Sequence, residues 1–466
     1  MGTSGPFPSR RAYIPAMSTA AVDPASIARP APRRQVVAWS LWDAGSSGFN
    51  VVILTFVFSV YLTDSVGEDL AGGSTQATAL LSWALAAAGL LIALLAPVTG
   101  QRADAGGRRK RSVIIWTCAT AACITGLFWV KDDVSYLWLG LVLMAAASVA
   151  NQFADVSYSA MLRQVSTPAT IGRVSSVGWA SGYVGGIILL LVCYVGFLAP
   201  DVGWFGVTFE NEGMSVRVIA LFAALWLLVL SIPLFLWVPE VPAAPKAQRV
   251  GFLASYRVLL ADLKELYRVD RHAVYFLGAS ALYRDGLAAV FTFGAIWAVS
   301  VYGITAQDVL IFGIAANVVS AIGALVGGRF DDRVGPKPVI IVSLLGMVAT
   351  SLILLFVSGP GMFWVFGLVL CTFVGPAQTS SRTFLARLAP PGREGQMFGL
   401  YATTGRAVSF LAPALVGLFT GIFDSERAGI AGIVIVLGLG LAALWAVHPP
   451  RDTAAVALAD TPTRTG

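Results

Sequence analysis

The stretch "GQRADAGGRRKR" (residues 100–111) decides how this chain is organised, because a second version, "GRFDDRVGPK" (328–337), occurs later. In both versions an aspartate follows a glycine by four residues, and a second glycine and basic residues come next: Gly100, Asp104, Gly107 and Arg109 in one, Gly328, Asp332, Gly335 and Lys337 in the other. Each version follows an apolar run. The glycines predict a tight turn between two helices. The repetition indicates a duplicated helical unit.

The composition places these units in a membrane. Of 466 residues, 57% are hydrophobic and only 12% are charged, whereas soluble domains carry about 25% charged residues. A membrane helix needs about 20 mostly apolar residues. Twelve spans are predicted on this rule: 35–62, 76–99, 112–131, 135–157, 173–198, 215–238, 273–302, 306–328, 338–357, 362–387, 397–421 and 427–448. We therefore expect an all-α membrane protein with twelve transmembrane helices in two six-helix bundles.

The spans divide the chain into five parts. We expect a disordered cytoplasmic segment at 1–34, a bundle at 35–238, a cytoplasmic linker at 239–272, a second bundle at 273–448 and a cytoplasmic tail at 449–466. Apolar residues at helical spacing in the linker predict an amphipathic helix on the inner membrane face. Either Met1 or Met17 is the start of the natural chain.

The charged loops predict the orientation. Lys and Arg gather in the loops on the side of the linker, while the alternate loops near 64–69, 132–133, 201–212 and 424–426 are acidic. Because cytoplasmic loops carry the excess of Lys and Arg, both termini are expected to be cytoplasmic, in a multi-pass protein of the plasma membrane. The net charge of +6 is explained by these loops, so we expect no nucleic-acid partner.

The sequence gives little support for a bound cofactor or for catalysis. The four cysteines lie in apolar runs without metal-type spacing, and the two histidines are far apart. No GxxxxGK[ST] phosphate-binding sequence occurs, so direct ATP hydrolysis is not expected. We expect no metal, no cofactor and no catalytic residues.

Charged residues inside the spans are the best functional candidates. A carboxylate near the bilayer centre costs about 2.5–3.5 kcal/mol and usually faces a bundle interior or a watery cavity. Asp43, in "AWSLWDAGSSGFN" (38–50), lies ~13 Å into the first span, and Asp285 lies at a matching depth in the seventh. We predict that this pair lines a transport pathway; the alternative is a structural bond to a helix N-terminus.

Further polar groups lie on neighbouring spans. The candidates for the substrate or proton pathway are Asp43, Asp285, Arg406, Gln152, Gln378 and Trp42. The candidates for gating salt bridges are Asp104, Asp332, Arg109, Arg333, Asp155 and Arg382. The alternatives are an inner gate without substrate contact for the charged groups, helix–helix hydrogen bonds for the glutamines and an interfacial position for the tryptophan. Arg284 is expected to point away from its neighbour Asp285.

The duplicated loop resembles "motif A" of the major facilitator superfamily, over roughly residues 35–448. That resemblance implies a loop that latches the two bundles in the outward-open state. "AWSLWDAGSSGFNVVILTFVF" (38–58) is similar to the W-x-x-Y-D-x-A-N-S-x-F opening of the unknown-major-facilitator subfamily, which includes the fungal vacuolar amino-acid effluxer linked to autophagy. "LYRDGLAAVFTF" (282–293), "GPAQTSSRTFLARLAP" (375–390) and "GREGQMFGLYATTGRAVSFLAP" (392–413) resemble its later motifs. Ser46 and Ser159 depart from it, which leaves the substrate open.

Together these patterns predict a secondary active transporter that works by alternating access. The resemblance implies a small solute, such as an amino acid or related metabolite, with export favoured. Coupling to protons through Asp43 or Asp285 is a further hypothesis. The alternatives are a uniporter or facilitator, a drug-type exporter and, more remotely, a membrane receptor or embedded enzyme. The expected partners are the solute, the lipid bilayer and protons, and the expected state is a monomer.

Overall fold

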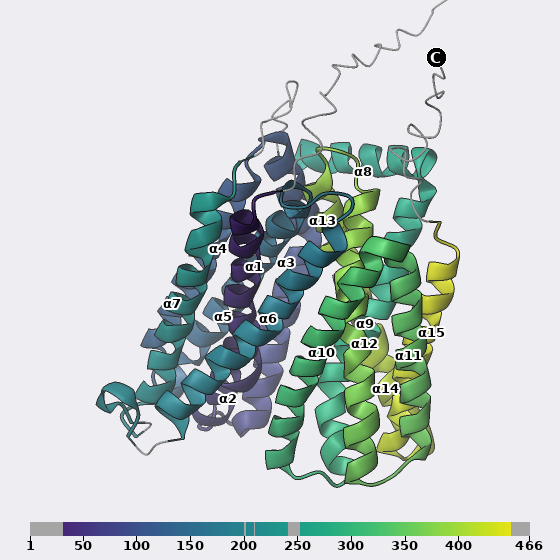
Figure 1. The fold of residues 1–466 in the computed structure, drawn as a ribbon. Helices are drawn as coiled ribbons and strands as arrows, with labels where there is room; N and C mark the ends of the chain where they lie inside the picture. The colour runs from purple at the N-terminus through teal and green to yellow at the C-terminus, as the bar shows by residue number, and fades with distance from the viewer. Residues whose placement is uncertain (1–30, 200–201, 209, 241–251, 449–466) are drawn as a thin grey trace, which may run out of the picture.

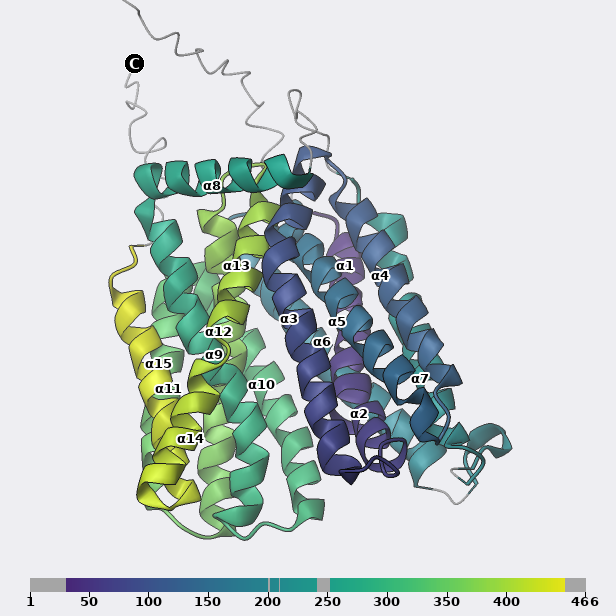
Figure 2. The same ribbon diagram turned by 180° about the vertical axis from the view of Figure 1, so that it is seen from behind.

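The computed structural model describes residues 31–199, 202–208, 210–240 and 252–448. Within this part of the chain, twelve helical spans are long and apolar enough to cross a membrane. Figures 1 and 2 show them as two groups side by side, with helix α8 (Phe252–Val269) lying across one end. We call that end the linker end and the opposite end the far end.

Six spans form the first half. The first span joins α1 (Arg33–Gly48), the π-helices η2 (Phe49–Phe56) and η3 (Tyr61–Ser65) and the short α2 (Phe58–Val60). The others are α3 (Gly73–Ala105), α4 (Arg109–Gly126), α5 (Leu137–Ala160), α6 (Ile171–Cys193) and α7 (Met214–Trp237).

The second half repeats this number of spans. It consists of α9 (Arg271–Ser300), α10 (Ala306–Val334), α11 (Pro336–Phe356), α12 (Pro360–Leu388), α13 (Glu394–Val408), α14 (Leu411–Phe423) and α15 (Gly429–Trp445). Helices α13 and α14 together make the eleventh span, which is interrupted at residues 409–410. The prediction of twelve transmembrane helices in two six-helix bundles is confirmed.

The turn predicted at the duplicated loops lies later than expected. The second and eighth spans continue to Ala105 and Val334, not to residues 99 and 328. Gly100 and Gly328 are therefore helical, and the predicted glycine turn is made by the later glycine of each version. The turns use Gly107 (φ +57°) and Gly335 (φ +86°), because glycine adopts positive φ without a Cβ clash.

The linker contains the predicted helix. On α8, Arg257, Lys264 and Arg268 are exposed, while Leu263 and Leu266 pack against a core cluster to which both halves contribute. A helix with one apolar face attaches to the bundle by that face. The predicted N-terminal segment (1–34) and tail (449–466) lie outside the described residues, except for 31–34. Within these four residues α1 already begins, at Arg33.

The two halves meet mainly through two helix pairs, α3 with α13 and α6 with α10. In both views the halves lie closest at the linker end and diverge toward the far end (Figures 1 and 2). The groups that join the halves at the linker end are therefore the first place to look for function.

Candidate functional site

Asp104 connects the halves at the end of α3. Its Oδ2 accepts a hydrogen bond of 2.9 Å from the backbone N–H of Gln396, in the first turn of α13. Its Oδ1 forms an ion pair of 2.7 Å with Nε of Arg109. The first N–H groups of a helix have no partner within the helix, and the helix dipole favours an anion there. A carboxylate of the first half thus binds a helix start of the second.

Glu394 strengthens the same junction. Its Oε2 accepts a 2.5 Å bond from Arg109, and its Oε1 lies 3.2 Å from Nη1 of Arg163. The same Nη1 also donates to the carbonyl of Ala389 at 2.9 Å. Arg109 and Glu394 are each only 5% exposed, so this is a buried network. Neither Glu394 nor Arg163 was predicted as a site residue, because nothing local in the sequence links the loop at 162–164 to the start of the eleventh span.

Asp332 makes the equivalent junction with the halves exchanged. Its Oδ1 accepts from the backbone N–H of Gly172 at 2.7 Å, and its Oδ2 accepts from the N–H of Arg173 at 3.2 Å, both at the start of α6. Nε of Arg173 donates to the same Oδ2 at 2.8 Å. Each aspartate of the duplicated loop thus binds the start of a helix in the opposite half.

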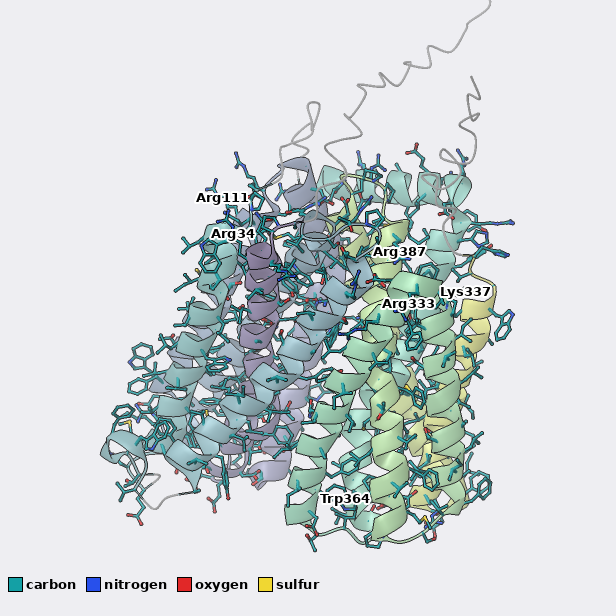
Figure 3. All side chains as sticks on the ribbon, in the orientation of Figure 1. Arg34, Arg111, Arg333, Lys337, Trp364 and Arg387 are labelled. Atoms are coloured by element: carbon teal, nitrogen blue, oxygen red, sulfur yellow. The ribbon has the colours of Figure 1, made fainter. Side chains whose placement is uncertain are left out.

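The prediction for Arg333 was wrong. Its side chain is exposed (labelled in Figure 3), and it forms no ion pair with any part of the chain that the structure describes. Arg173 takes its place as the partner of Asp332. The neighbouring Asp331, which was not predicted, is buried and accepts from Thr383 at 2.5 Å and from Arg387 at 3.1 Å. It fastens α10 to α12 within the second half.

The two loop glycines bring helix backbones of opposite halves into contact. A Cβ placed on Gly100 would overlap the carbonyl oxygen of Gly395, at the start of α13. A Cβ on Gly328 would lie 2.7 Å from the carbonyl oxygen of Gly172 and would overlap the hydroxyl of Ser176. Small residues let helices approach this closely. The sequence suggested that these glycines serve the turn. In the structure they serve the junction, where they allow the two halves to come close.

Asp43 forms a third link, between the parts of α1 and α12 nearer the linker end. Its Oδ2 accepts from the hydroxyl of Tyr158 at 3.1 Å and pairs with Nη1 of Arg382 at 3.2 Å. Arg382 comes from α12 in the second half. Its Nη2 and Nε also donate to the backbone carbonyl and hydroxyl of Ser175, at 2.7 and 3.0 Å. Arg382 therefore pairs with Asp43, and no ion pair joins it to Asp155.

Asp285 does not share the environment of Asp43. It is buried, and its Oδ2 accepts a 2.6 Å bond from the backbone N–H of Ala412, in the first turn of α14. This is the structural bond to a helix N-terminus that the sequence left as the alternative. The difference arises because the eleventh span is interrupted beside Asp285, which exposes backbone N–H groups there.

The remaining four pathway candidates lie on four different helices. Nε2 of Gln152 donates to Asp155 at 3.3 Å on α5. Gln378 is half-buried on α12, one turn before Arg382, and Arg406 is exposed on α13. Trp42 is 1% exposed and donates to Thr117 of α4 at 2.9 Å, so it packs inside the first half. Trp39, and not Trp42, lies beside Arg382, at 5.0 Å from ring centre to guanidinium carbon.

We predict that Asp285→Ala lowers the free energy of unfolding by about 1–3 kcal/mol, because the buried N–H of Ala412 would lose its acceptor. Thermal unfolding of the purified protein in detergent measures this loss. Asp285→Asn is the matched control, since its amide oxygen can still accept the bond and should lose less. Equal losses in the two variants would contradict the capping role.

Comparison with known proteins identifies the family. The model of the family described as "Vacuole effluxer Atg22 like" matches residues 31–456. The chain belongs to this family. Among relatives of this Atg22-like protein, an uncharacterized MFS-type transporter of Bacillus subtilis, YxiO, is 24% identical over 90% of this chain and 96% of its own length. Autophagy-related protein 22-1 of Aspergillus fumigatus is 27% identical over 60% of this chain, and the match spans about half (48%) of that fungal protein.

Solved structures agree on the fold. The proton:xylose symporter XylE superposes with a TM-score of 0.71 at 13% identity, covering 89% of this chain and 95% of the symporter. The transporter FucP, in its outward conformation, gives 0.70 at 14% identity, covering 90% and 98%. Identities this low show the fold alone. Family and fold together make the Atg22-like chain a membrane transporter of the major facilitator type, and not an enzyme.

Proposed function

We propose that this Atg22-like protein is a secondary active transporter that exports a small solute, such as an amino acid or related metabolite, by alternating access, as a monomer. The observation that carries the proposal is the pair of equivalent junctions at the linker end. Asp104 and Asp332 each bind the helix start of the opposite half. Because both junctions cross between the halves, they must break for the linker end to open.

The junctions suit a gate that opens and closes. Hydrogen bonds to charged groups contribute about 1.5–3 kcal/mol each, so a few of them are enough to favour one state without locking it. Contacts formed at the far end on closure would offset their loss. The state described here is then the one with the linker end closed, and the solute enters or leaves at the far end.

We also propose that the linker end faces the cytoplasm and that the protein lies in the plasma membrane. Basic residues at the linker end support this orientation, including the labelled Arg34, Arg111 and Arg387 (Figure 3). Cytoplasmic loops carry such an excess of Lys and Arg. The family's description names a vacuolar effluxer, which supports export as the direction.

Proton coupling is proposed through Asp43. Its carboxylate pairs with Arg382 of the opposite half, so its protonation would remove one charge from a link between the halves. Asp285 is the weaker candidate, because its partner is a backbone N–H within its own half. The alternative of a facilitator without coupling needs no protonation of either residue.

The test is transport by the full chain in sealed vesicles that contain a pH-sensitive dye, with each radiolabelled amino acid supplied outside in turn. We expect a pH gradient to drive accumulation of at least one of them. Asp43→Asn is expected to lose this uphill transport by about tenfold or more, while exchange of labelled for unlabelled solute continues. Asp424→Asn is the matched control, since Asp424 is exposed and its left-handed backbone (φ 47°) suits asparagine.

Three results would contradict parts of the proposal. Flux without proton movement would favour the facilitator. No flux of any amino acid would contradict the proposed solute class. Unchanged uphill transport by Asp43→Asn would remove Asp43 from the coupling.

A further inference from the structure

Two arginines near the middle of the second half form no ion pair within the part of the chain that the structure describes. Of the three arginines in this region, Arg382 is fully engaged by Asp43 and Ser175. Arg284 of α9 and Arg406 of α13 form no ion pair with any residue in the described ranges. A cation held within a span is costly unless it faces water or finds a counter-ion, so these two charges call for an explanation.

Arg284 is fixed against α13. Its Nη1 donates to the carbonyl of Tyr401 at 2.9 Å, and its guanidinium carbon lies 3.7 Å from the centre of the Tyr401 ring. A Cβ on Gly405 would come within 3.1 Å of the same Nη1. The guanidinium therefore occupies the space that the missing side chain of Gly405 leaves. One carbonyl uses only part of its five N–H donors.

Arg406 follows Gly405 directly and reaches the boundary between the halves. Its Cδ lies 3.8 Å from the position that a Cβ on Gly89 of α3 would take. Its side chain is exposed although it lies on a membrane-spanning helix. No hydrogen-bond partner of its guanidinium is seen in the part of the chain that the structure describes. Arg284 contacts Gly405, Arg406 follows it in the chain, and the two guanidinium groups are close enough to repel each other.

The nearby carboxylates are engaged elsewhere. Asp285, the neighbour of Arg284, accepts from the backbone of α14. Asp155 accepts from Gln152, and Asp43 pairs with Arg382. Asp155 is close enough to Arg284 to attract it, but no ion pair joins the two, and neither arginine is paired among the described residues. A counter-ion from outside the chain would fit this place.

We propose that Arg284 and Arg406 form a binding subsite for an oxyanion group, a carboxylate or a phosphate, of the transported solute. The planar guanidinium fork matches both groups with paired hydrogen bonds. The small Gly405 and Gly89 leave the room in which the two arginines lie. The subsite rests on the proposed transport function and narrows its solute to compounds that carry an anionic group, which argues against a cationic drug.

Matched probes test the subsite on the full chain in lipid nanodiscs. Leucine is compared with leucinamide, 4-methyl-2-oxopentanoate with its amide, and inorganic phosphate is added as a separate arm. Thermal unfolding up to millimolar probe concentration measures binding. We expect at least one oxyanion to raise the unfolding temperature while the amides do not. Arg284→Gln and Arg406→Gln should each weaken this binding about tenfold or more, and Arg406→Lys should restore part of it.

Arg329→Gln is the control, since Arg329 is exposed and donates only within its own helix, to Leu325. A carboxylate or a phosphate that binds in an arginine-dependent way supports the subsite and identifies the source of the oxyanion. The subsite would be overturned if acids and amides changed the unfolding temperature equally, or if no probe changed it. Unchanged binding in both glutamine variants would overturn it as well. Arginine-dependent binding without flux in vesicles would contradict the transport proposal alone; flux that neither variant alters would contradict the subsite alone.

Discussion

Arg109→Gln is expected to open the linker end. Arg109 lies between two carboxylates, Asp104 and Glu394, and all three side chains are at least 93% buried. Its removal leaves two buried negative charges close together, with the partly exposed Arg163 as the remaining cation beside Glu394. Breaking a buried ion pair from one side costs about 3–5 kcal/mol. Glu394 joins Asp104 and Arg109 only in the closed state, so that state bears the cost. Its population relative to the open state should fall about a hundred- to a few thousandfold.

Alkylation of a single cysteine measures this shift. Ser176 is 1% exposed and packs against Gly328 at the junction of α6 with α10, so Ser176→Cys in a chain without its native cysteines reports opening. Labelling by a water-soluble maleimide should become much faster with Arg109→Gln. Arg111→Gln is the matched control, since the Arg111 side chain is exposed on the same helix (Figure 3). An unchanged rate with Arg109→Gln would show that this network does not hold the gate.

Gly100→Ala is expected to act on the same gate by steric overlap. The added methyl group would overlap the backbone of Gly395, which belongs to the opposite half. Backbone cannot rotate away as a side chain can, so α3 and α13 must separate. Overpacking of this kind costs about 1–3 kcal/mol, which lowers the closed population about ten- to a hundredfold.

The cysteine reporter at position 176 measures this variant too. Gly278→Ala is the matched control, because Gly278 is also helical and nothing lies within 4 Å of the added Cβ. The control should label at the parent rate and unfold at a similar or slightly higher temperature. If Gly100→Ala left the labelling rate unchanged, the close approach of Gly100 and Gly395 would be no part of closure.

The duplicated loop shows where prediction from the sequence succeeded and where it stopped. Asp104 and Asp332 were chosen as candidates for gating salt bridges, and the structure shows each of them at a helix start of the opposite half, α13 and α6. Arg333 was a candidate for the same role, whereas the cation that pairs with Asp332 is Arg173, from the other half. Glycine suits both tight turns and close helix contacts, and sequence spacing does not distinguish the two roles. Only the structure shows that Gly107 makes the turn and Gly100 the contact.

The paired acids make the same point within the spans. Asp43 and Asp285 occupy equivalent positions in the first helix of each half, yet one binds Arg382 and the other the start of α14. Their depth follows from counting residues along a helix. The partner of Asp285 depends on the interruption at 409–410, which no local pattern at residue 285 predicts.

The sequence by itself determined the number of spans, their grouping in two sets and the depth of each charged residue. The physical reason is that lipid requires long apolar helices and places charges at their ends or toward a protected interior. Only the tertiary structure decided which charges of the two halves meet, that Gly100 and Gly328 are contact points and that Arg284 and Arg406 have no acidic partner among the described residues. Those facts depend on how helices far apart in the chain pack against one another.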